Sequence, residues 1–360
     1  MTDAPELIRM TAREVQEAVR ANTTVENADL TGLDLTGLNL HLGRFHGCRL
    51  DRADFSGQKL EKTGFRDCSL KGALFVDCSF TDMLLQRLDF SQAVFHKAFF
   101  LRCHLSGSNL AGADFESARV HWTFLDKADL SGARFNGAEF LKSVCVNAQC
   151  AGADFSGSRL ERVTFRQARM EGCVLRGAEF DHVNLSGAKL AGHDFSGQKL
   201  RSVNFSGAEL AGANFSQADV STCVFQGAVL TKARLERVTA RQCVFGAAKL
   251  DQVDGREGNF DLSFFGEADL SQSDFRQARF NSAKFTKARV QEAAFMDCDC
   301  SSCDMSHADL SGSDFSRANL LLACLHGVTD EKTRFNGANK AFLRGPDADM
   351  AAAEDFKAPA

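Results

Sequence analysis

The 360-residue sequence contains no tyrosine, one tryptophan and only 3 prolines. It has no run of 18 apolar residues and no charged-then-apolar leader, so we expect neither a membrane span nor a secretory signal. The formal net charge of −5 does not fit a nucleic-acid-binding protein with a basic face. The sequence also lacks a Walker loop, a dinucleotide-binding glycine fingerprint, HExxH and GxSxG. We therefore expect no enzymatic activity and no cofactor.

Apolar side chains recur every five residues along most of the chain. The positions whose numbers are multiples of five, from Leu30 to Leu325, number 60, and all except Gly255 are apolar or small. Two residues before each of them stands a second small or apolar residue, as in Ala113-Asp114-Phe115. A period of five fits neither a helix nor a strand, so it predicts a repeat architecture.

A longer period of 20 lies within the short one. Of the 15 positions 55, 75, 95 and onward to 335, 12 are phenylalanine, and of the 15 positions 30, 50, 70 and onward to 310, 11 are leucine. This sorting predicts that residues 20 apart stack on one another, with four five-residue sides in each coil. The absence of tyrosine agrees with a dry interior, where a phenol would lack a hydrogen-bond partner.

The Ala-(Asp/Asn)-(Leu/Phe) pattern resembles the pentapeptide-repeat family over residues 28–325. This resemblance implies an all-β fold, a right-handed quadrilateral parallel β-helix of about 15 coils. Coils spaced near 4.8 Å would form a rod about 70 Å long. We expect three regions: an N-terminal helical cap (1–27), the β-helix (28–325), and a last partial coil with a C-terminal cap or disordered tail (326–360).

Two segments depart from the pattern. Thr11 and Glu14 have the spacing of a capping box, and Ala12 to Arg20 reads as a short amphipathic helix. We expect this helix to cover the open N-terminal coil, the alternative being that it docks a partner. At Gly255 the column loses its large side chain, which predicts either a local bulge or kink or a tolerated gap in the core.

The 13 cysteines follow the repeat rather than a ligand pattern. A free cysteine packs as a small hydrophobe, so this usage indicates a reducing cytoplasm. We expect Cys324 alone to point outward. The run Cys298, Cys300 and Cys303 is not expected to bind metal, since its thiols should face inward with no histidine nearby. Nine cysteines occupy the inward small position and three the central one: Cys48, Cys68, Cys78, Cys103, Cys173, Cys223, Cys243, Cys298 and Cys303; Cys145, Cys150 and Cys300.

One side of the coil carries apolar residues where polar ones are expected. An exposed apolar patch that contains a tryptophan is typical of a protein contact. The alternative is that these side chains lie flat against their neighbours or merely suit a strand. Self-association and a foreign partner fit equally well. The candidate interface residues are Leu84, Phe99, Leu101, Trp122, Phe124, Leu141, Val144, Val146, Val224, Val244 and Phe264.

The first of two functional hypotheses is a cytoplasmic protein-interaction scaffold or adaptor. A helix followed by many repeats is similar to pentapeptide proteins that accompany bacterial type VI secretion modules. The second is a DNA mimic, as in the topoisomerase-protecting members of the family. Mimicry needs a dense field of one sign, and the acidic line is interrupted by Leu74, Val94, Arg134, Val174 and Arg234. The acidic line consists of Asp54, Asp114, Asp154, Asp194, Asp254, Asp274 and Asp314.

Overall fold

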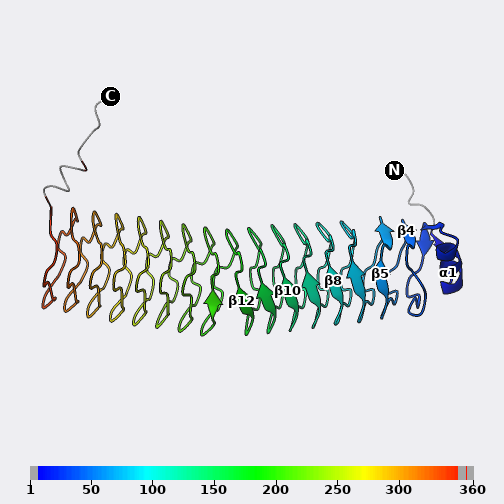
Figure 1. Cartoon of the computed structure of the whole chain (residues 1–360), viewed down its shortest axis with the longest axis horizontal. Helices are drawn as coiled ribbons and strands as arrows, with labels where there is room; N and C mark the ends of the chain where they lie inside the picture. The colour runs from blue at the N-terminus through cyan, green and yellow to red at the C-terminus, as the bar shows by residue number, and fades with distance from the viewer. Residues whose placement is uncertain (1–6, 348–353, 355–360) are drawn as a thin grey trace, which may run out of the picture. The chain divides into compact units, whose positions relative to one another are not determined.

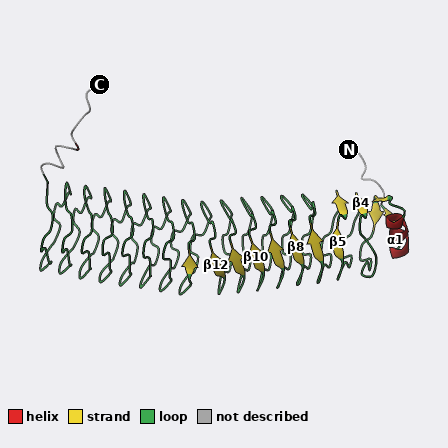
Figure 2. Ribbon diagram, viewed as in Figure 1, coloured by secondary structure: helices red, strands yellow, loops and turns green. Residues whose placement is uncertain are grey.

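A computed structural model describes residues 7–347 and Glu354. The chain divides into two compact units, residues 1–188 and 189–360, and each is described by itself below. Figures 1 and 2 show helix α1 near the N-terminus followed by a series of short strands joined by turns. Among the described residues, no helix is long and apolar enough to cross a membrane.

Within residues 7–347, unit 1 contains helix α1 (Ala12–Arg20) and twelve short strands, and unit 2 contains one strand. The strands of unit 1 are β1 (Ile8–Arg9), β2 (Thr24–Glu26), β3 (Ala28–Asp29), β4 (Arg44–His46), β5 (Lys59–Glu61), β6 (Gly64–Arg66), β7 (Ser79–Thr81), β8 (Phe99–Leu101), β9 (Arg119–His121), β10 (Glu139–Leu141), β11 (Arg159–Glu161) and β12 (Glu179–Asp181). The strand of unit 2 is β13 (Leu200–Arg201).

Helix α1 begins where the sequence predicts it. The Thr11 side chain accepts a hydrogen bond from the Glu14 amide, and the Glu14 carboxylate accepts one from the Thr11 amide at 2.7 Å, which completes the capping box. Val15 is fully buried, and the Gln16 side chain bonds both to the backbone N–H and to the C=O of Asn39. These contacts favour the interpretation of α1 as a cover for the first coil.

The backbone ladder pairs each residue with the residue 20 positions later. In unit 1, Phe45 lies opposite Phe65 in the pair β4–β6, and Phe80 lies opposite Phe100 in the pair β7–β8. Isolated bridges keep the same register in both units. In unit 1 they join eight residues spaced by 20, from Asp34 to Val174, and in unit 2 they join eight from Asp194 to Arg334. The predicted parallel β-solenoid is confirmed, while the coil count differs somewhat from the predicted 15.

The core consists of side-chain columns that run across the coils. Phe55 stacks on Phe75 with ring centroids 4.9 Å apart, and Phe75 stacks on Phe95 at 5.1 Å with an interplanar angle of 6°. In unit 2, Phe225 and Phe245 repeat this arrangement at 4.9 Å. Each such pair adds about 0.5–1.5 kcal/mol beyond the burial of its apolar area. The predicted phenylalanine stacking is therefore confirmed within both units.

Nearly every corner between two sides is formed by a residue with a left-handed backbone, Gly37 being an exception. Gly132 (φ 63°) takes this conformation without strain, whereas Trp122 takes it with a bulky side chain (φ 54°). The outward aspartate that precedes a corner stabilises the turn through its side chain. For example, the Asp114 carboxylate accepts a hydrogen bond from the Glu116 amide at 3.1 Å. Corners are consequently built from backbone conformation and aspartate side chains together.

Gly255 leaves the ladder intact. The bridges from Arg234 to Asp254 and from Asp254 to Asp274 continue on either side of it, and the Gly255 amide donates to the Asp274 carbonyl at 2.8 Å. The Phe275 ring fills the space, since a Cβ at Gly255 would lie 2.3 Å from Phe275 Cε1. Of the two predicted alternatives, the structure supports the tolerated gap.

Cys324 lies in an outward column, as predicted, but its side chain is buried. This residue is only 7% exposed, and its Sγ lies 3.4 Å from the Ser306 hydroxyl. Its column neighbours on the adjoining coils are Asp304 and Arg344. Because both are larger than a thiol, a cysteine between them is shielded even in an outward column. The predicted C-terminal cap or disordered tail lies mostly outside the described residues.

Candidate protein-interaction surface

Eight of the predicted interface residues gather on neighbouring coils of unit 1, and we call them the Trp122 surface: Leu84, Phe99, Leu101, Trp122, Phe124, Leu141, Val144 and Val146. None of the eight is buried. Leu84 is 68% exposed, Trp122 47% and Phe124 38%. They occupy two sides of the coil and the corner between them.

The first side is carried by β8, β9 and β10. Leu101 and Leu141 flank His121 in this sheet. The Phe99 ring meets the His121 ring edge-on at 5.3 Å, and the Arg119 guanidinium lies 4.5 Å from the Phe99 centroid. Burial lowers the pKa of His121, and this favours a neutral ring within an apolar surface.

Trp122 forms the corner and Phe124 begins the second side. The Trp122 amide donates to the Leu141 carbonyl at 2.8 Å, while the Lys142 ammonium lies 4.1 Å from the centroid of the indole ring. Phe124 stacks on His104 with centroids 4.7 Å apart and pairs with Val144 on the next coil. Both rings therefore rest partly against neighbours yet keep much of their area in solvent.

The other three predicted interface residues lie in unit 2. Val224, Val244 and Phe264 form a column of their own, and the Phe264 ring lies across Gly246 and Gly266. A Cβ at Gly266 would come within 2.2 Å of Phe264 Cζ. Phe264 nevertheless remains 41% exposed. The predicted interface residues thus fall into two separate groups.

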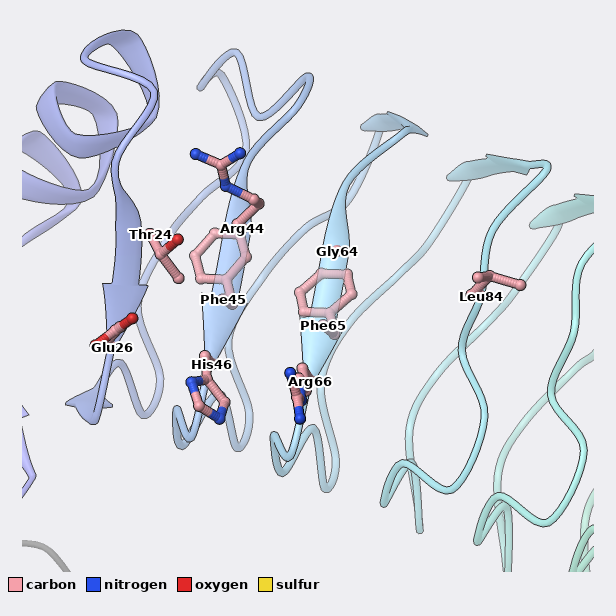
Figure 3. A pocket seen from close by; sticks show the side chains of 9 residues that line it. All are labelled: Thr24, Glu26, Arg44, Phe45, His46, Gly64, Phe65, Arg66 and Leu84. Carbon is pink, nitrogen blue, oxygen red and sulfur yellow. The ribbon is translucent and has the colours of Figure 1, made fainter.

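A hollow of about 460 Å³ adjoins the Trp122 surface at Leu84. It arises at Gly64, which contributes no side chain between Arg44 and Leu84 in the same column. Figure 3 shows these three residues on neighbouring coils, with the rings of Phe45 and Phe65 close by. The charged groups around it have both signs: Glu26, Arg44, His46 and Arg66 all line the hollow.

Several contributors to this region were missed at the level of sequence. His104 and His121 support the aromatic rings, and Gly64 creates the hollow. Their signal was available, because each lies 20 residues from a neighbour in its column: His104 from Phe124 and from Leu84, His121 from Leu101 and from Leu141, and Gly64 from Leu84.

Two side-chain clusters among the described residues contain enough ligand atoms for a metal ion. In the first, Asp114 and Glu116 face His96, but the Arg134 guanidinium lies 3.2 Å from Asp114 and 3.5 Å from Glu116 and compensates their charge. The second comprises His307, His326 and Glu354. There the Asp347 amide donates to Nδ1 of His326, so a neutral His326 carries its proton on Nε2, the atom that faces Glu354 at 3.5 Å. In both clusters the carboxylates therefore face groups of the protein that can donate hydrogen bonds to them.

Several of the buried cysteines are poor nucleophiles, whereas a hydrogen bond with Cys68 lowers the pKa of Cys48 to about 7. All 13 are buried free thiols. Burial raises the pKa of Cys78 to about 12, of Cys103 to about 11 and of Cys223 to about 12. Since the thiolate is the reactive form, these three groups have a packing role.

Four of the seven aspartates of the predicted acidic line, Asp114, Asp254, Asp274 and Asp314, form ion pairs with arginines. Asp254 contacts Arg256 at 2.7 Å, and this hydrogen bond lowers the pKa of Asp254. Asp314 contacts Arg334 at 3.0 Å, as Asp114 does Arg134 at 3.2 Å. Compensated pairs of this kind do not present the dense negative field of a DNA surface.

Two models of pentapeptide repeats match most of this sequence. One matches residues 21–57, 48–86, 73–112, 84–121, 113–143, 178–217, 208–246, 265–299 and 293–329, and the other matches residues 146–189. The chain belongs to the pentapeptide-repeat family. No curated protein matches it. Family membership agrees with the five-residue period and the register of 20 described above.

Solved pentapeptide-repeat structures are similar to this family member at low identity. HetL, involved in heterocyst differentiation regulation in the cyanobacterium Nostoc sp. strain PCC 7120, is 20% identical over 74% of this chain and 91% of its own, with a TM-score of 0.28. A protein from the Arabidopsis thaliana thylakoid lumen is 25% identical over 29% of this chain and 72% of its own (TM-score 0.22). QnrB1, a plasmid-mediated fluoroquinolone resistance protein, is 15% identical over 78% and 94% (TM-score 0.22). These similarities carry no argument about function.

Proposed function

We propose that this pentapeptide-repeat protein is a non-enzymatic scaffold that binds another protein through the Trp122 surface. The observation that carries the proposal is a contiguous group of exposed and half-buried aromatic and aliphatic side chains centred on a tryptophan that is 47% exposed. Exposed apolar patches of this kind are typical of protein contacts, and tryptophan is enriched among the residues that dominate binding energy.

The position of Trp122 adds support. Its left-handed backbone is shared by many other non-glycine corners of this chain and is not itself a signal. What distinguishes Trp122 is a large aromatic ring at an exposed corner, where it contributes little to the core. Such a ring is available for contact with another molecule.

The test is capture of proteins from the native host with immobilised protein, followed by mass spectrometry. We expect Trp122→Ser with Phe124→Ser to abolish the specific capture, because removal of central aromatic residues costs about 2 kcal/mol or more each. The matched control is Leu262→Ser with Leu322→Ser, two apolar corner residues of unit 2 that are each 48% exposed and also have positive φ. Equal capture by wild type and the Trp122 variant would overturn the proposal.

A finer assignment is an adaptor that accompanies a type VI secretion module and acts in the bacterial cytoplasm. Its support is the layout of a capping helix followed by repeats. Recovery of a secretion component or effector in the capture experiment would support it, and recovery of only unrelated partners would contradict it.

The alternatives are a DNA mimic and self-association. A gyrase supercoiling assay distinguishes a DNA mimic from a scaffold. Inhibition of gyrase, or relief of its inhibition by quinolones, is expected only of a DNA mimic. Sedimentation distinguishes self-association from binding of a foreign partner. Self-association requires that the wild type be an oligomer and that Trp122→Ser with Phe124→Ser disrupt it. The ion pairs of Asp114, Asp254 and Asp314 make the mimic the weaker alternative.

A further inference from the structure

We infer that the partner segment bound by the Trp122 surface is a peptide in which acidic residues flank aromatic or aliphatic ones. This inference rests on the proposed function and specifies the chemistry of the partner. It follows from the charged side chains that surround the apolar residues of the Trp122 surface.

Four cations border the Trp122 surface: Lys127, Lys142, Arg162 and Arg166. Backbone hydrogen bonds between coils fix their places. Lys142 lies in the same corner column as Trp122, and its amide donates to the Glu161 carbonyl at 2.9 Å. Lys127 lies at the far edge of the second side, and its amide donates to the Val146 carbonyl at 2.9 Å. The Asn147 amide donates to the Arg166 carbonyl at 2.9 Å and so places Arg166 one coil beyond Val146.

No ion pair within the described part of the chain involves any of these four cations. Of the neighbouring acids, Glu161 is paired with Arg159 at 2.9 Å. Glu139 lies on the first side, 3.5 Å from the His121 ring. Asp126 is the acid that remains at the edge of the second side. The rim of the surface is therefore cationic in a chain whose net charge is −5.

An apolar centre with a cationic rim is complementary to an apolar segment with carboxylates on either side. The surface reaches over about four coils, which at about 4.8 Å per coil spans about 14 Å, the length of about four residues of extended chain. Such dimensions fit a short linear segment.

Single-stranded nucleic acid is the competing ligand, because cations and aromatic rings together also bind bases and phosphates. The structure favours the peptide for two reasons. The Trp122 ring already has Lys142 over it and the Phe124 ring already stacks on His104. The rest of the centre is aliphatic and consists of Leu141, Val144 and Val146. Successive bases of a single strand would need further aromatic rings there to stack on.

The experiment is selection of a displayed random-peptide library on three full-length proteins. These are the wild type, a charge-reversed variant (Lys142→Glu, Arg162→Glu, Arg166→Glu) and a control with the same change in net charge (Arg52→Glu, Lys71→Glu, Lys232→Glu). We expect wild type and control to select peptides with Asp or Glu beside Leu, Phe or Trp. We expect the charge-reversed variant to select Lys or Arg at those places and to bind the wild-type peptides about tenfold or more weakly, with an affinity that falls with salt.

The outcomes distinguish this inference from the proposed function. If Trp122→Ser with Phe124→Ser removes binding of the selected peptides but charge reversal does not, the inference fails and the proposed function stands. If neither change alters selection, or no peptide is enriched over the Trp122 variant, both fail. Binding of a single-stranded oligonucleotide that competes with the peptides and depends on the same cations would also overturn the inference.

Discussion

Buried cysteines replace alanine or leucine in the inner columns, and their effect on stability should depend on pH. In the folded protein, burial holds the pKa of Cys78, Cys103 and Cys223 at about 12, 11 and 12, above the ordinary value of 9.0. Their contribution to stability is fully present below pH 9 and is lost as the pH rises toward the folded pKa, because only the unfolded thiols ionise there.

We therefore predict that the free energy of unfolding falls above about pH 9, with each buried thiol contributing up to about 1.4 kcal/mol per pH unit. Alanine at Cys78, Cys103 and Cys223 together should make this decline shallower by up to about 4 kcal/mol per pH unit. Urea unfolding at several pH values measures both slopes. The chain has no tyrosine that would titrate in the same range. Identical slopes in the two proteins would contradict the account.

At the scale of an element, α1 stabilises the first coil through its cap, through Val15 and through the side chain of Gln16. The capping box joins Thr11 and Glu14 reciprocally. An unpaired coil edge invites another chain to pair with it, so loss of the cover should expose β2 to aggregation.

We predict that Thr11→Ala lowers the free energy of unfolding of unit 1 by about 1 kcal/mol, because the helix loses its N-cap acceptor. Thr11→Ser keeps the hydroxyl and serves as the matched control. Hydrogen exchange of the β2 amides measures the local effect and should speed up in the alanine variant alone. Equal exchange in the two variants would mean that α1 does not protect this edge.

At the scale of the whole molecule, the repeat itself made most of the fold predictable. Residues that share a number modulo 20 share a column, so the sequence alone was enough to predict the stack of Phe55, Phe75 and Phe95. It was enough for α1 as well, because the capping box is a local signal. The burial of Cys324 was not predicted because exposure depends on the size of Asp304 and Arg344 on the adjoining coils, which the position within a repeat does not reveal.

The candidate surface was predicted in part. Leu84, Trp122 and Phe124 could be predicted as exposed from their outward positions within the five-residue repeat. The rings of His104 and His121, the hollow at Gly64 and the unpaired rim cations depend on which side chains meet across coils. The period of 20 is enough to place His104, His121 and Gly64 beside their column neighbours, but the contacts themselves are set by rotamer and side-chain length, which the period does not give.

Trp122 is the only tryptophan in the chain, so its fluorescence reports on the proposed interface without a label. In the free protein, a side chain that is 47% exposed should emit at long wavelength and be quenched readily by acrylamide. On titration with the captured partner or a selected peptide, we predict a shift of the emission to shorter wavelength and protection from acrylamide, both saturating with the binding curve. Saturable binding that leaves the emission and quenching of Trp122 unchanged would contradict the central claim that this surface is where the protein acts.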